Sequence, residues 1–217
     1  PLHDRPTLTL EGRFIVDGAD WPFVVMNNHL RSLSNVESEA RVRLKRHEQA
    51  QSVAAKVQAR QAADPNLPII LVGDKNAFEF TDGYVDVIGL LSGTSVEDQN
   101  LVNIENADDP GFDPSNQVTP TLFNPLVRLP EGERYSFLFR QSTRSVAQTL
   151  DHALLNRAAS RFISDYGYMR GNADYWLGFE DDDSTVARSS DHDGLVLVLE
   201  PGRDIDLLFR DRFEEQP

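Results

Sequence analysis

Apolar residues follow two different periods along the first third of the chain. Residues 8–16 alternate loosely between apolar and polar, residues 21–26 are almost continuously apolar, and Gly18 lies between them, which predicts a two-stranded hairpin. From residue 36 to 61, apolar positions recur at helical spacing among charged residues and glutamines, which predicts an amphipathic helix. Residues 69–72 then form another apolar run. The order strand, helix, strand predicts a helix that covers a sheet.

The remainder of the chain contains further strand signals and one long polar segment. Residues 78–91 predict a turn followed by a short helix. Residues 92–132 are rich in Asn, Asp, Pro and Gly, so they predict either a functional loop or a segment without regular structure. Apolar or aromatic runs at residues 135–139, 148–156 and 195–199 predict three more strands, the last of them buried because its apolar content is unbroken.

Composition limits the size and class of the protein. The 217 residues, of which 40% are hydrophobic, suffice for one domain with a sizeable core, and we assign residues 1–200 to it and residues 201–217 to a charged tail. No apolar run approaches the length of a membrane span and no charged-then-apolar leader is found, so we expect a soluble chain or a piece of one. The net charge of -14 argues against general adhesion to nucleic acid, but a bound divalent cation can reverse the sign locally.

Candidate chemistry gathers in four polar clusters beside or within the predicted strands. They are His29, Asp74 with Asn76, Asp151 with His152, and Asp191 with His192. Asp74 and Asn76 are two residues apart and would point to the same side of an extended chain, although Gly-Asp-x-Asn is also ordinary turn chemistry. Taken together, the clusters supply what is needed to bind a hard cation, grip a phosphoryl oxygen and transfer a proton. The absence of cysteine excludes disulfides and favours oxygen-binding metals.

The four clusters resemble, in the same order, the motifs of the endonuclease/exonuclease/phosphatase superfamily. The matching segments are NHLRS at residues 28–32, GDKNA at 73–77, TLDHAL at 149–154 and SDHDG at 190–194. Together with residues 135–137 and 172–174, they most resemble the bacterial secreted nuclease-like branch. The resemblance spans about residues 5–199 and implies an α/β (α+β) fold, a four-layer αββα sandwich of the DNase-like type. It alone suggests a secreted or periplasmic location.

Two features depart from the family pattern. Lys75 stands where the family usually has an aromatic residue or leucine. Nothing before His29 supplies the first-strand asparagine and the glutamate metal ligand of the family's opening half. We therefore expect the chain to hold only the carboxyl-terminal half of the domain, with an incomplete metal site.

The resemblance implies a hydrolase that acts by in-line attack of water on a phosphoester. We expect a metal-dependent nuclease; the alternatives are a phosphatase or phosphodiesterase for lipid or inositol phosphates, or a non-catalytic interaction module that kept the fold. The implied cofactor is Mg²⁺ or Mn²⁺, with Ca²⁺ as a further option, and the implied partner is nucleic acid or another phosphoester substrate.

Roles for the site residues also follow from the resemblance. His192 is expected to be the general base or a donor to a phosphate oxygen, oriented by Asp151, and Asp74 either activates the water or protonates the leaving oxygen. His152 is interpreted as structural. The expected catalytic residues are His29, Asp74, Asn76, Asp151 and His192, the phosphate-binding residues are Asn76, His29, Arg31 and Arg188, and the expected metal ligand is Asp191 with a glutamate from the absent half.

Overall fold

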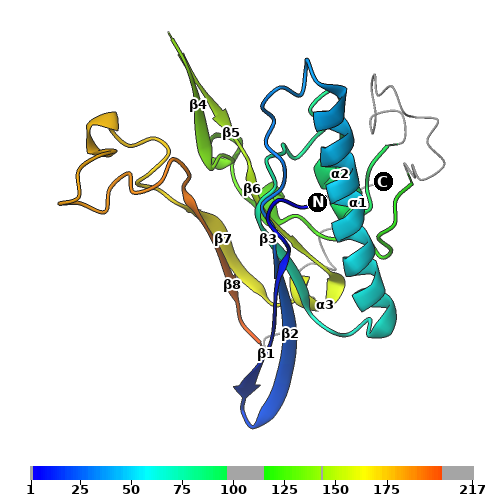
Figure 1. Cartoon of the computed structure of the whole chain (residues 1–217). Helices are drawn as coiled ribbons and strands as arrows, with labels where there is room; N and C mark the ends of the chain where they lie inside the picture. The colour runs from blue at the N-terminus through cyan, green and yellow to red at the C-terminus, as the bar shows by residue number, and fades with distance from the viewer. Residues whose placement is uncertain (1, 97–114, 143, 202–217) are drawn as a thin grey trace, which may run out of the picture.

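A four-stranded sheet forms the middle of three layers in the computed structural model, which describes residues 2–96, 115–142 and 144–201 (Figure 1). In spatial order its strands are β1 (Leu8–Val16), β2 (Ala19–Asn27), β3 (Ile69–Asp74) and β6 (Asp151–Leu155). β2 and β3 are parallel, and the other two pairs are antiparallel. The hairpin predicted in the first 27 residues is therefore confirmed.

Helices cover one face of this sheet. The predicted amphipathic helix is confirmed as α1 (Ala40–Ala63), and the predicted short helix as α2 (Val87–Ser92). α1 begins four residues later than predicted, because Asn35 adopts a left-handed conformation and opens a turn before the helix. The core on this face joins residues such as Val53, Leu71 and Leu91, and burying each such side chain contributes about 1.5–3 kcal/mol.

A second, smaller sheet packs on the opposite face. It contains β7 (Ile163–Met169) and β8 (Gly194–Leu199), which run antiparallel. Leu195, Leu197 and Leu199 turn inward to a core shared with β3 and β6, whereas Val198 on the other face is 40% exposed. The fold is thus mixed α/β, with the order helices, sheet, sheet. Within the described ranges no helical layer covers the outside of β7 and β8, so the four-layer sandwich stays a prediction.

Shorter elements complete the described chain. β4 (Phe137–Gln141) and β5 (Arg144–Gln148) form a hairpin that extends away from the main sheet (Figure 1). The other elements are α3 (Arg157–Ser160) and three 3-10 turns, η2 (Pro125–Arg128), η3 (Glu131–Glu133) and η4 (Leu177–Phe179).

The long polar segment is only partly described. Residues 97–114 and most of the charged tail lie outside the described residues. The described end of the segment is not a free loop, since Phe123 forms a β-bridge with Leu155 along β6. No helix in the described part of the chain is long and apolar enough to cross a membrane.

Candidate active site

The register between β3 and β6 places two carboxylates side by side. Asp74 ends β3, Asp151 begins β6, and the two residues are directly paired across the antiparallel ladder. Gly73 allows the end of β2 to approach: it has φ +111°, and a Cβ there would lie 2.4 Å from the carbonyl oxygen of Asn28. The same close approach brings the loop after β2, which carries His29, toward the two acids.

Asp151 holds the imidazole of His192. The distance from Asp151 Oδ2 to His192 Nδ1 is 2.6 Å. This hydrogen bond, opposed by burial, raises the pKa of His192 above its usual value. Phe137 fixes the other side of His192, because the two residues form a β-bridge and their rings lie 4.9 Å apart. The structure thus brings together the pair that the sequence predicted.

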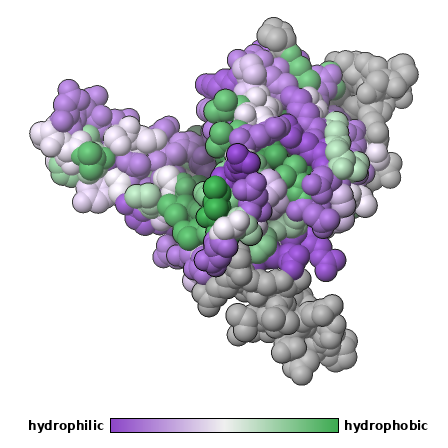
Figure 2. Space-filling model, turned by 90° about the horizontal axis from the view of Figure 1, so that it is seen from below, coloured by the Kyte–Doolittle hydropathy of each residue, from purple (hydrophilic) through white to green (hydrophobic). Residues whose placement is uncertain are grey.

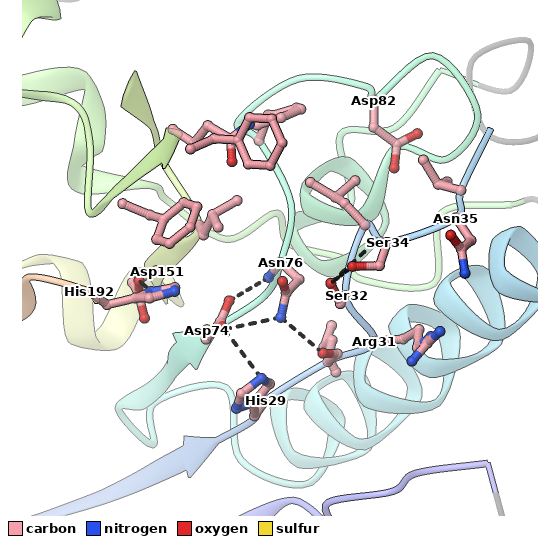
Figure 3. Close-up of a pocket in the computed structure, with 18 of the residues that line it drawn as sticks. His29, Arg31, Ser32, Ser34, Asn35, Asp74, Asn76, Asp82, Asp151 and His192 are labelled. Atoms are coloured by element: carbon pink, nitrogen blue, oxygen red, sulfur yellow. Dashed lines mark hydrogen bonds and ion pairs between the residues drawn. The ribbon is translucent and has the colours of Figure 1, made fainter. Parts of the chain in front are cut away.

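Asp74 is the centre of a second group of contacts. His29 Nε2 lies 3.3 Å from Asp74 Oδ2, and the Asn76 amide Nδ2 donates to the same oxygen at 3.0 Å (Figure 3). Burial, and next the charge of Asp151, raise the pKa of Asp74. A carboxyl group with a raised pKa is better suited to proton transfer near neutral pH.

Asn76 reaches Asp74 by a different route from the one expected. The chain does not stay extended after β3, since Asn76 has φ +47° and its backbone N–H donates to Asp74 Oδ1 at 2.7 Å. This is an Asx turn, so the turn interpretation of the motif also applies. Both amide hydrogens of Asn76 have acceptors, because Nδ2 also donates to the Leu30 carbonyl at 3.2 Å. In this arrangement Asn76 positions Asp74, and a contact of Asn76 with phosphate stays a prediction.

These side chains line one cavity of about 1320 Å³. All five expected catalytic residues border it (Figure 3), and so do Arg31 and Asp191. Its walls also include residues 30–38 and Phe78, Phe137 and Phe139. Strand pairing and loop contacts therefore bring four distant segments of the chain to one place. The site is open enough to admit a substrate larger than a single phosphate ion.

Three of the cavity residues form a group able to hold a metal ion. Asp74, Asp151 and His192 each offer a ligand atom, and these atoms lie within 4.8 Å of one another. Two carboxylates and one imidazole fit a hard or borderline divalent cation such as Mg²⁺ or Mn²⁺. Asp191, the ligand expected from the sequence, lies in the cavity wall but is not part of this group.

Arg188 does not contribute to the cavity. Its guanidinium is buried, and Nη1 donates to the carbonyl of Asn172 at 2.6 Å and to that of Ala173. The expected phosphate contact of Arg188 is thus replaced by a structural role in the loop before β8. His152 is structural as expected: it is fully buried, its Nε2 lies 2.8 Å from the Ala77 carbonyl oxygen, and burial lowers its pKa to about 4.

Ser136 was not assigned a role from the sequence. Its hydroxyl oxygen accepts the backbone N–H groups of Leu150 and Asp151, both at 3.1 Å, so it fixes the start of β6 where the Asp151 carboxylate projects. Tyr168 supports the same residue from the second sheet through a 2.7 Å bond to the Asp151 carbonyl. In the sequence, the role of Ser136 was indicated only by the presence of a single hydroxyl residue within an aromatic strand.

Comparisons with known proteins give structural similarity only. Neither protein-family models nor curated proteins match the chain. A crystal structure of D. rerio TDP2 complexed with a single-strand DNA product aligns with TM-score 0.45 and 14% identity over 87% of this chain and 60% of that one. The mannosyl-6-phosphatase of Bacteroides thetaiotaomicron gives 0.46 and 16% over 91% and 59%. Beta toxin of Staphylococcus aureus gives 0.42 and 12% over 89% and 57%.

The chain thus spans less than two thirds of the length of each of these three solved proteins. Another similar structure, from Bacteroides thetaiotaomicron, is described as an endonuclease/exonuclease/phosphatase family protein, with TM-score 0.44 and 16% identity over 90% of this chain and 54% of that one. Similarity of this degree does not assign the chain to a family.

Proposed function

We propose that the chain carries the active site of a metal-dependent phosphoesterase that hydrolyses phosphodiester bonds, with nucleic acid as substrate. The observation that carries the proposal is the convergence of His29, Asp74, Asn76, Asp151 and His192 on one cavity. Their contacts supply an oriented imidazole, a carboxyl group with a raised pKa and a cation-binding group within one site. Phosphoester hydrolysis needs these three functions together.

Asp74 and Asp151 would hold the metal ion, with Asp191 at the cavity wall, because the protonated His192 of this mechanism has no free lone pair for a cation. A bound Mg²⁺ or Mn²⁺ supplies charge neutralisation on the phosphoryl oxygens. The protein itself provides positive charge at the same place, because the Asp151 contact favours the protonated form of His192. Arg31, in the cavity wall, adds a guanidinium that can pair with a phosphate oxygen.

Proton transfer falls to Asp74 and His192. Asp74 accepts a proton from the attacking water, with its Oδ2 fixed by His29 and Asn76. Protonated His192 donates a hydrogen bond to the phosphoryl group as negative charge builds there, and Asp151 fixes the ring. As the bond from phosphorus to the leaving oxygen breaks, His192 gives its proton to that oxygen. His29 Nε2, beside Asp74, is placed to contact the phosphoryl group as well.

The test is hydrolysis by the purified chain. Bis-(p-nitrophenyl) phosphate, plasmid DNA and a soluble inositol polyphosphate are each incubated with Mg²⁺, Mn²⁺ or chelator, using wild type, His192→Ala and Asp74→Asn. We expect metal-dependent cleavage of the first two substrates and a loss of about 10²–10⁴-fold in both variants. Arg41→Gln, which removes an exposed arginine paired with Glu39, is the control and is expected to keep wild-type activity.

Other outcomes would redirect the proposal. Turnover of the inositol polyphosphate alone would indicate a phosphatase. Absence of turnover by wild type with every substrate would contradict hydrolysis by this chain. Turnover after the expected missing half of the domain is added would then indicate a truncated enzyme, and its continued absence would favour the interaction module. Calorimetric titration with Mn²⁺ then shows whether the Asp74, Asp151 and His192 group binds a cation without turnover.

A further inference from the structure

Arg46 is a buried cation that the proposed chemistry does not use. It lies in the second turn of α1, and its side chain is 1% exposed. Burying a guanidinium is costly unless its N–H groups meet acceptors and its charge meets a counter-charge. The groups that accept hydrogen bonds from Arg46 therefore show which part of the structure this buried charge stabilises.

The guanidinium joins two loops around the cavity. Nη1 donates to the carbonyl of Arg31 at 2.6 Å and to that of Asn76 at 2.8 Å. Nη2 donates to Asp82 Oδ2 at 2.8 Å, and the Asp82 side chain is 2% exposed. Arg31 lies in the loop after β2, Asn76 and Asp82 lie in the loop between β3 and α2, and Figure 3 shows all three around the same cavity.

Both ends of this network are fixed. Asp82 Oδ1 accepts the backbone N–H groups of Tyr84 and Val85, which ties the counter-ion to the segment leading into α2. On α1, Gln49 Oε1 accepts the backbone N–H of Arg31 at 2.7 Å. The helix therefore holds Arg31 by both its N–H and its carbonyl group.

The contacts of Arg46 set the spacing of the phosphate-handling loops. Arg31 lies two residues after His29, and Asn76 lies two residues after Asp74. Because one planar guanidinium holds the carbonyls of Arg31 and Asn76, it fixes the distance between the loop of His29 and the loop of Asp74. Only arginine offers several donors in a rigid fork, and lysine cannot reproduce it.

We propose that Arg46 is a positioning residue that acts through the backbone of Arg31 and Asn76 and holds the two loops at the separation that one phosphoryl group requires. This inference rests on the proposed phosphoryl site, but its test can be read without turnover. Arg46 does not reach the substrate. Its contribution is the geometry of His29 and Asp74, and a displacement of about 1 Å at such a site can reduce a rate 10²-fold.

The experiment separates positioning from stability. Arg46→Met alone leaves Asp82 as an uncompensated buried charge and is expected to unfold easily. The double variant Arg46→Met/Asp82→Asn removes both charges, keeps the oxygen that accepts the Tyr84 and Val85 N–H groups, and is expected to remain folded. Urea unfolding verifies this before any other measurement. Gln61→Met is the control, since Gln61 is also buried on α1 but donates to the carbonyl of Pro120, which is not in the cavity wall.

Two readouts test the role in the folded double variant. Calorimetric titration with inorganic phosphate in the presence of Mg²⁺ is expected to show affinity at least 10-fold weaker than wild type, whereas Gln61→Met stays within about twofold. With bis-(p-nitrophenyl) phosphate, kcat of the double variant is expected to fall about 10–100-fold with a smaller change in KM. In Arg46→Lys, kcat is expected to lie between the values of the double variant and wild type.

Each outcome decides the proposal. A folded double variant with wild-type phosphate affinity and kcat would show that Arg46 only stabilises the fold. A wild-type chain that binds no phosphate would overturn the proposal too, because no phosphoryl site would then need positioning. Loss of phosphate affinity in a chain that never turns over substrate would support Arg46 as a positioning residue while refuting the hydrolase.

Discussion

At the scale of single residues, Lys75 has the most unusual environment in the site. Its side chain is fully buried just beyond the end of β3, next to Asp74, and its Nζ donates to the Val72 carbonyl at 2.5 Å. Burial is the largest effect and lowers the pKa of Lys75 to about 7, although both carboxylates oppose it. Lys75 is therefore not a surface cation.

This environment predicts a pH-dependent stability. Between pH 7 and about 10.5 the unfolded chain binds a proton at Lys75 that the folded chain does not, so the stability of wild type rises with pH by up to ~1.4 kcal/mol per pH unit. Lys75→Met removes this group, so its stability relative to wild type should be greatest at pH 6 and decrease toward pH 10. Urea unfolding at pH 6, 8 and 10 measures this, with exposed Lys56→Met as the control for a lost surface charge. A difference that is constant with pH would refute the buried charge.

At the scale of elements, Asn156 links the start of β3 to the end of β6. Its Oδ1 accepts the backbone N–H groups of Ile69 at 2.9 Å and Ala159 at 3.0 Å, and its Nδ2 donates to the Leu67 carbonyl at 2.8 Å. The side chain is thus both the N-cap of α3 and a clamp on the entry to β3. Since Asp74 and Asp151 lie at the other end of the same strand pair, the clamp supports the site from a distance.

Removing this clamp should be costly. Asn156→Ala leaves the Ile69 N–H and the Leu67 carbonyl buried without partners, and we expect a loss of about 2–4 kcal/mol in the free energy of unfolding. Asn124→Ala is the matched control, because Asn124 caps η2 through a single bond to the Leu126 N–H and should lose about 1 kcal/mol. Urea unfolding of both variants measures the difference, and equal losses would contradict the clamp.

Elements with a clear period were predictable from the sequence, and others were not. The β1–β2 hairpin, α1, β3 and β8 each follow an apolar pattern that reports burial on one or both faces. β5 has no such pattern, because its residues are exposed on both faces except at its end. β7 was also missed, since Ser164, Asp165 and Gly167 interrupt its apolar positions.

The site also has a part that could be predicted from the sequence and a part that could not. The polar residues at strand ends could be named, because an acid or histidine beside a buried strand is conspicuous. Their partners could not, because the contacts of Arg46 with Asn76 and Asp82 join residues far apart in sequence and leave no local pattern. The inward direction of Lys75 likewise depends on how the chain turns after β3.

At the scale of the whole molecule, exposed apolar surface favours self-association, whereas the negative net charge opposes it. Among the described residues β1 pairs only with β2, and its Leu8 and Leu10 are 69% and 57% exposed. Figure 2 shows apolar side chains on the surface seen from below. The net charge of -14 repels other copies of the chain and limits contact through this edge.

Salt should therefore promote self-association. Raising NaCl from 0.05 to 0.5 M screens the charge repulsion, so the mass measured by light scattering during gel filtration should increase. Leu10→Lys places a charge on the exposed strand and should keep the chain monomeric under the same conditions. Val186→Lys, which alters an 88% exposed residue outside the strands, is the control and should behave as wild type. A constant wild-type mass at both salt concentrations would contradict this prediction.

The pairing of Asp74 with Asp151 makes the packing of both cores and the geometry of the site depend on the same strand register. Sliding β6 by one residue against β3 would place His152 opposite Asp74 and turn the Asp151 carboxylate toward the helices, because neighbouring strand residues face opposite sides. The same slip would move the side chain of Leu154 from the core beneath the helices to the core between the two sheets. An insertion or deletion in β6 would thus abolish packing and chemistry together, which leaves the connecting loops that do not border the cavity as the part of this scaffold where length can vary.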